Sequence, residues 1–155
     1  MIQRIQSVFL LLTTLLAVLF LTGDIFKFAG GNDTTFSMNI KGIYEVAIDN
    51  NLLYLTNTIP VLLLSVLLPL ISLPAIFLFR NRKLQQKLTV ILIFFDLLLI
   101  ASAAFYGITS IKENHWTLIP QFRMFIPVIN LVLLLLAYRG IKKDENLVRS
   151  YDRLR

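Results

Sequence analysis

The sequence predicts an all-α membrane protein: an antiparallel bundle of four transmembrane helices, with a small β-hairpin or sheet in the first outer loop. Three observations favour this fold. Hydrophobic residues make up 57% of the 155 residues and charged residues only 15%, whereas soluble domains average roughly one half and one quarter. The apolar residues gather in four long segments with almost no charge. A polar, turn-rich segment separates the first two of them.

The four apolar segments have the length that a bilayer demands. Residues 5–23 and 50–79 carry no charge, Asp96 is the only charge in 88–111, and Arg123 is the only charge in 114–138. Nearly uncharged apolar runs of roughly 18 residues or more are typical of spanning helices. We therefore expect a single domain over 1–155 that consists of spans at about 5–22, 52–79, 87–108 and 117–138, an outer loop 23–51 and a tail 139–155.

Lysine and arginine set the expected orientation, because they are retained on the cytoplasmic side of inner-membrane proteins. One side of the predicted bundle carries Arg4, Arg80, Arg82, Lys83, Lys87, Arg139, Lys142, Lys143, Arg149, Arg153 and Arg155. The other side carries only Lys27, Lys41, Lys112 and Arg123. Both termini are therefore expected in the cytoplasm.

The outer loop has the residue pattern of β-structure. Phe36, Met38 and Ile40 alternate with polar residues, and a Gly-Gly-Asn-Asp turn precedes them. This pattern predicts a hairpin of 25–29 with 34–40. A second alternation over 44–48 favours a third strand. Because a lone hairpin is marginally stable in water, we expect this sheet to lie on the outer ends of the helices.

Asp96 is the first candidate for function, because an ionisable side chain at mid-membrane is costly and normally faces the bundle interior. We expect it in an intramembrane polar cluster with four residues at similar depth, Asn130, Ser65, Thr13 and Thr14. Two interpretations remain open. The cluster either titrates a proton or binds an ion, or it is a structural hydrogen-bonding group that holds the helices together.

A second group of polar and aromatic residues is expected at the outer interface, and it consists of Arg123, Asn57, His115 and Trp116. Arg123 is predicted either to extend to the interface or to reach inward toward Asn57. Trp116 is typical of an interfacial anchor. His115 is the only histidine and is expected at the outer interface, whereas Asp96 is expected about 15 Å deeper along the helix axis, too far for a Ser-His-Asp triad.

Several function classes are disfavoured by what the sequence lacks. Without cysteines there are no disulfides or thiolate metal sites, and a single histidine adds no metal site. No phosphate-binding loop, dinucleotide fingerprint or HExxH motif is present. No basic run is interleaved with aromatics as in a nucleic-acid surface. We therefore expect no cofactor, no nucleic-acid partner and no enzymatic activity.

The tail combines charges with an apolar stripe. Leu147, Val148, Tyr151 and Leu154 have helical spacing, and Glu145 with Arg149 forms an i,i+4 pair. Such a helix either lies on anionic lipid, favoured by about 1 kcal/mol per basic residue, or docks a cytoplasmic partner. The candidate docking residues are Lys142, Lys143, Asp144, Glu145, Leu147, Val148, Arg149, Tyr151, Asp152 and Arg153.

Both ends of the chain carry a resemblance. The opening Met1-Ile2-Gln3-Arg4-Ile5-Gln6 and the tail motif from Lys142 to Arg155 resemble a family of small four-span membrane proteins from Bacteroidetes-type bacteria, known only as a domain of unknown function. The resemblance implies a Gram-negative inner membrane and a four-helix architecture, and it implies no activity.

Two functions follow as hypotheses. The first is a non-enzymatic accessory or scaffold subunit of a larger inner-membrane complex, which docks through the cytoplasmic tail and the first periplasmic loop. The second is a small oligomeric transporter or a proton- or ion-conducting protein that uses Asp96. The partners are accordingly the lipid bilayer and either other inner-membrane proteins or further copies of the chain.

Overall fold

The computed structural model describes residues 5–30, 34–46, 52–78, 81–114 and 116–153. Four α-helices make up most of this part: α1 (Ile5–Phe20), α2 (Ile59–Phe77), α3 (Arg82–Asn114) and α4 (Ile126–Arg153). A short 3-10 helix, η2 (Phe122–Phe125), leads directly into α4. Since a helix rises about 1.5 Å per residue, α1 is about 24 Å long and α3 about 50 Å.

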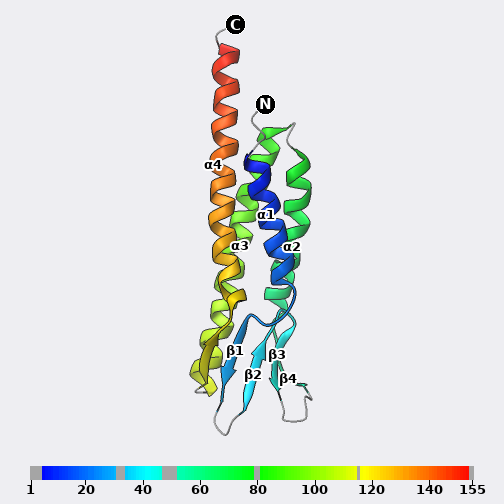
Figure 1. Cartoon of the computed structure of the whole chain (residues 1–155), viewed down its shortest axis with the longest axis vertical. Helices are drawn as coiled ribbons and strands as arrows, with labels where there is room; N and C mark the ends of the chain where they lie inside the picture. The colour runs from blue at the N-terminus through cyan, green and yellow to red at the C-terminus, as the bar shows by residue number, and fades with distance from the viewer. Residues whose placement is uncertain (1–4, 31–33, 47–51, 79–80, 115, 154–155) are drawn as a thin grey trace.

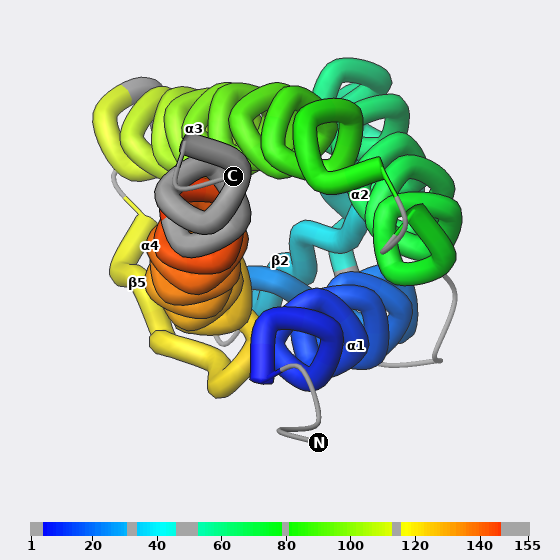
Figure 2. The backbone as a smooth tube through the Cα atoms, turned by 90° about the horizontal axis from the view of Figure 1, so that it is seen from above, coloured from blue at the N-terminus to red at the C-terminus, as the bar shows by residue number. Residues whose placement is uncertain are grey.

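The helices form an antiparallel bundle in which each packs against two neighbours. Seen from above, α1, α2, α3 and α4 follow one another around a ring, and α4 closes the ring against α1 (Figure 2). The start of α1 and the end of α4 lie at one end of the molecule, here called the terminal end (Figure 1). The strands lie at the opposite end, here called the sheet end.

The sheet is larger than the sequence predicts. It has five antiparallel strands in the order β4-β3-β2-β1-β5, with bounds β1 (Phe26–Ala29), β2 (Thr35–Met38), β3 (Gly42–Val46), β4 (Leu52–Asn57) and β5 (Thr117–Pro120). The expected hairpin is present as β1 and β2, with Phe26 opposite Met38. Strand β5 pairs with β1, and this pairing ties the start of the α4 segment to the first outer loop.

The second apolar segment is not one continuous helix. Residues 52–57, expected as the first part of a span, form strand β4, and α2 begins only at Ile59. Pro60 lies at the start of α2, where its missing N–H costs nothing and its fixed φ favours the helix. The apolar residues 53–55 therefore belong to the sheet. Pro69 and Pro74 lie within α2, which continues through both.

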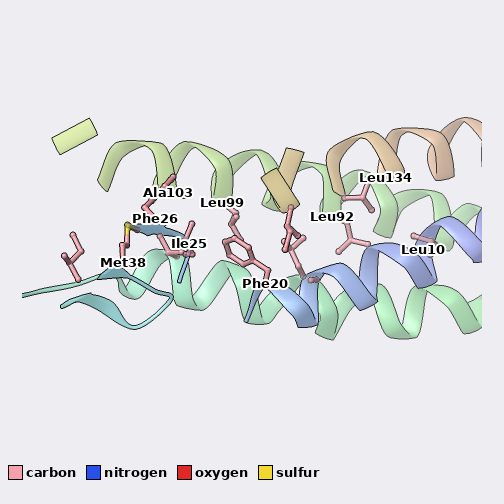
Figure 3. Close-up of a cluster of buried hydrophobic side chains, with 14 of the residues drawn as sticks. Leu10, Phe20, Ile25, Phe26, Met38, Leu92, Leu99, Ala103 and Leu134 are labelled. Atoms are coloured by element: carbon pink, nitrogen blue, oxygen red, sulfur yellow. The ribbon is translucent and has the colours of Figure 1, made fainter. Parts of the chain in front are cut away.

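One apolar core runs the length of the molecule. At the sheet end it contains Phe26, Ile25 and Met38, and it continues between the helices to Leu10 and Leu134 (Figure 3). Along α4 the buried positions recur every three or four residues, at Ile126, Asn130, Leu134, Ala137 and Ile141, so one stripe of the helix faces its neighbours.

The outside of the bundle is as apolar as its inside. Large exposed side chains include Leu15, Val66, Leu70, Phe94 and Val132. Among the described residues, α2, residues 82–112 of α3 and residues 122–146 of η2 and α4 are long and apolar enough to cross a membrane, and α1 is a shorter apolar helix. Such a continuous apolar exterior is unusual for a water-soluble monomer.

Candidate functional site

Asp96 lies in the middle of α3 and is fully buried. Within the part of the chain that the structure describes, neither carboxyl oxygen has a hydrogen-bond partner. Asp96 lines a small enclosed cavity of about 10 Å³ together with Asn130 of α4 and Ser65 of α2. The expected association of these three residues is thus present in the structure, and it is built from three different helices.

The polar atoms around this cavity are mostly hydrogen-bond acceptors. The Asn130 side-chain oxygen is buried and, among the described residues, has no partner. The Ser65 hydroxyl donates its hydrogen to the Leu62 carbonyl oxygen at 2.8 Å, so its oxygen offers lone pairs to the cavity. The other lining residues are apolar: Ala17, Phe20, Leu68, Leu99 and Pro127.

This arrangement defines what the cavity can do chemically. An ionised carboxylate among apolar groups is costly, and no lysine, arginine or histidine lines the cavity. The cavity can take up a proton on Asp96, or it can hold one water-sized guest that donates hydrogen bonds to some of these oxygens. Across the described residues, no group of three or more His, Cys, Asp or Glu side chains could hold a metal ion.

Thr13 and Thr14 are buried, but they do not line the cavity. The Thr13 hydroxyl donates to the carbonyl oxygen of Phe9 at 3.0 Å, within its own helix. The Thr14 hydroxyl lies 2.8 Å from that of Ser72 and 2.8 Å from the carbonyl oxygen of Leu10. Thr14 therefore links α1 to α2 at a separate polar contact.

Sequence reasoning missed Ser72, although a signal for it exists. Ser72 follows Ser65 by seven residues, which places both on one face of a helix. That face is the buried one, because Leu68 and Ala75 are buried with them. Gln85 is a second omission: its side-chain nitrogen donates to the Ala75 carbonyl oxygen at 3.0 Å and joins α3 to α2.

Arg123 lies in η2 at the sheet end, and its guanidinium packs against Gly23 rather than pairing with Asp96. A Cβ at Gly23 would lie 2.7 Å from the Arg123 Cζ, and Gly23 has φ +96°, so both space and backbone favour glycine there. The Arg123 Nε is buried and has no partner among the described residues. Asn57 is exposed on β4, where its backbone pairs with Gly42.

Trp116 is part of the sheet-end packing. Its ring stacks on Phe36 with centroids 3.8 Å apart and an interplanar angle of 16°, and it lies 5.8 Å from the ring of Phe28. These ring contacts hold the β5 segment on the other strands. The sequence predicts only a role for Trp116 as an interfacial anchor. His115 lies outside the described residues.

The tail is a direct continuation of α4, because the helix runs without a break from Ile126 to Arg153. It extends beyond the other three helices at the terminal end (Figure 1). Its base is fixed: the Gln6 side-chain amide of α1 donates to the Asp144 carboxylate, and Arg82 of α3 donates to the Asp144 carbonyl oxygen at 2.8 Å. A continuous helical extension therefore leaves the bundle.

Basic and polar side chains surround the base of this extension. Lys142 and Lys143 line a shallow groove of about 420 Å³ with Arg139 and Asn146. Glu145 lines another groove, between α3 and α4. The side chains of Leu147, Val148, Arg149, Tyr151, Asp152 and Arg153 lie outside the described part, although the helix backbone is described to Arg153.

The comparisons with known proteins assign a family and no activity. A search of curated proteins and a search of solved structures gave no match. The family described as "Domain of unknown function (DUF4293)" matches residues 2–154, nearly the whole chain. The match agrees with the resemblance seen at the two ends of the sequence, and the chain belongs to this family.

Proposed function

We propose that the chain is a non-enzymatic accessory or scaffold subunit of a larger complex in the bacterial inner membrane. It crosses the bilayer with four helices and docks through the C-terminal extension of α4 and through the periplasmic sheet. Membrane insertion is supported by the distribution of polarity: Asp96, Asn130 and Ser65 are buried while Phe94 and Val132 are exposed. This arrangement suits a hydrocarbon solvent.

The orientation follows from charge. The terminal end carries Arg82, Lys83 and Lys87 at the start of α3 and the basic residues of the α4 extension. The sheet end carries Lys27, Lys41, Lys112 and Arg123. Retention of lysine and arginine in the cytoplasm places both termini there and the sheet in the periplasm. The α4 extension then points into the cytoplasm.

The α4 extension is the observation that carries the docking role. A helix that only rests on lipid needs a bend where it leaves the bilayer, and α4 continues straight into its extension (Figure 1). The contacts of Asp144 with Gln6 and Arg82 fix its base. A helix that is already folded before binding loses little conformational entropy when it binds. The helical spacing of Leu147, Val148 and Tyr151 suits a helix-binding groove on a partner.

Scrambling residues 145–155 at constant composition tests this role. The tagged protein is expressed in its native host, purified in mild detergent, and the associated proteins are quantified by mass spectrometry. We expect the scrambled variant to co-purify with at most one tenth of the partner recovered with the unmodified protein, while it still inserts into the membrane. As a matched control, exchanging Leu147 and Val148 preserves the stripe and should retain the partner. Equal recovery with the scrambled variant would contradict the docking role.

The cavity around Asp96 favours a second candidate function, conduction of protons or small cations by an oligomer of the chain. Its supporting observation is the set of buried oxygens of Asp96 and Asn130 that have no hydrogen-bond partner among the described residues. Ionisable residues inside a membrane commonly mark ion or proton pathways.

The purified protein in liposomes tests conduction. Asp96→Asn is expected to abolish proton or cation flux and to leave assembly intact, because the amide fills the same space without exchanging a proton. Asp24→Asn, at the sheet end, is the matched control and should leave flux unchanged. Normal flux in Asp96→Asn, or no flux in the unmodified protein, rejects this candidate.

A further inference from the structure

An open groove lies at the sheet end, between α3 and the start of α4. Its volume is about 310 Å³. Ile25, Phe26 and Ala103, labelled in Figure 3, lie on its wall where α3 passes the first strand. The rest of the wall comes from α3, β5, η2 and α4, and it includes Ala104, Gly107, Leu118, Met124, Pro127 and Val128.

Small residues of α3 create this hollow. Ala103, Ala104 and Gly107 leave the space that longer side chains would fill, and a Cβ at Gly107 would touch the ring of Phe26 at 3.4 Å. The wall consists almost entirely of apolar side chains, together with the thioether of Met124. A groove of this chemistry suits a flexible hydrocarbon chain.

A positive charge adjoins the groove along the chain. Arg123 precedes Met124, and its guanidinium rests on Gly23, two residues before Ile25. Its Nε is buried without a partner in the described part of the chain. The neighbouring Asp24 pairs with Lys27 at 3.7 Å. A half-buried guanidinium that has no carboxylate partner among the described side chains favours an external anion, and its fork of donors matches phosphate.

We propose that this groove and Arg123 form a binding site for an acidic phospholipid of the outer leaflet. One acyl chain lies along Ala104 and Gly107, and the headgroup phosphate accepts hydrogen bonds from Arg123. The proposal rests on the membrane insertion proposed above. It needs no partner protein, and therefore it stands or fails separately from the docking role of α4.

Native mass spectrometry of the full-length protein in mild detergent tests the site, with dioleoyl phosphatidylglycerol and dioleoyl phosphatidylcholine as probes. For the unmodified protein, we expect half-maximal retention of phosphatidylglycerol at a lipid concentration at least tenfold lower than the one that phosphatidylcholine requires. Arg123→Gln should reduce retention of phosphatidylglycerol to that of phosphatidylcholine, because the guanidinium attracts the net negative charge of phosphatidylglycerol, whereas the quaternary ammonium of phosphatidylcholine offsets its phosphate charge. Lys112→Gln removes a charge at the sheet end and should leave the retention of both lipids unchanged.

Two further variants separate the groove from the charge. Ala104→Phe fills the groove from an exposed position and should weaken retention of both lipids at least tenfold, whereas Ala101→Phe, on the same helix outside the groove, should not. If Arg123→Gln fails to fold, Arg123→Lys replaces it, with an expected intermediate preference because the charge persists without the fork.

Three results would overturn the proposal. The unmodified protein could retain both lipids equally, or Ala104→Phe could behave like Ala101→Phe. Alternatively, Ala104→Phe could dissociate a dimer without changing lipid retention, which would identify a second copy of the chain as the occupant of the groove.

Discussion

At the scale of single residues, the informative positions are those where a polar atom has lost water without gaining a protein partner. Among the described residues, the carboxyl oxygens of Asp96 and the amide oxygen of Asn130 are buried in this way. Such groups cost free energy unless something satisfies them. Thr14 and Ser72, by contrast, satisfy each other between α1 and α2. The first set therefore carries the functional interest, and the second is structural.

Gly23→Ala is expected to destabilise the protein by about 1–2 kcal/mol, because Gly23 has φ +96° and a Cβ would press on Arg123. Thermal unfolding in detergent measures the effect. Gly107→Ala is the matched control: its Cβ makes ordinary contact with Phe26, and alanine favours a helix over glycine. Equal melting temperatures for the two variants would contradict the assigned role of Gly23.

At the scale of elements, the sequence predicts the helices that have a long apolar run and the strands in which apolar and polar residues alternate. The four apolar helices, the hairpin of β1 with β2 and the meeting of Asp96 with Asn130 follow from these patterns. Strand β4 does not, because Leu52–Asn57 is uncharged and joins the apolar run of α2 without a charged boundary. Only Pro60 marks the helix start. Strand β5 is equally hidden, because its pairing with β1 is a contact between distant segments.

The local sequence pattern also does not predict where α4 ends. The sequence separates an apolar span from a charged tail at about residue 138, and the structure joins both in one helix to Arg153. No glycine or proline stop follows Gly140, and Gly140 packs close to Gln6 of α1. The contacts that fix the extension, between Gln6, Arg82 and Asp144, link residues up to 138 positions apart.

At the scale of the whole molecule, the helices differ in length for a reason. Spans of about 30 Å suffice for the hydrocarbon core, and α3 at about 50 Å is longer. Its last turns pass the sheet, where Phe26 lies against Ala103 and Gly107 (Figure 3). The proposed periplasmic sheet therefore packs directly on α3 at these residues.

The proposed orientation is directly measurable, because the natural sequence has no cysteine and any introduced cysteine is unique. Lys41→Cys, in the connection between β2 and β3, should react with a membrane-impermeant maleimide in cells whose outer membrane alone is permeabilised. Asn146→Cys, on the α4 extension, should react only after the inner membrane is opened. The reverse labelling pattern would place the termini in the periplasm and remove the cytoplasmic docking role.

The central claim is that the protein works as part of a larger assembly, and the composition of its native complex tests this claim most directly. We would purify the natively expressed, tagged chain in mild detergent and determine the mass and protein content of the particle. The account predicts a stoichiometric complex with at least one larger membrane protein. A homogeneous particle that contains only copies of this chain would contradict it.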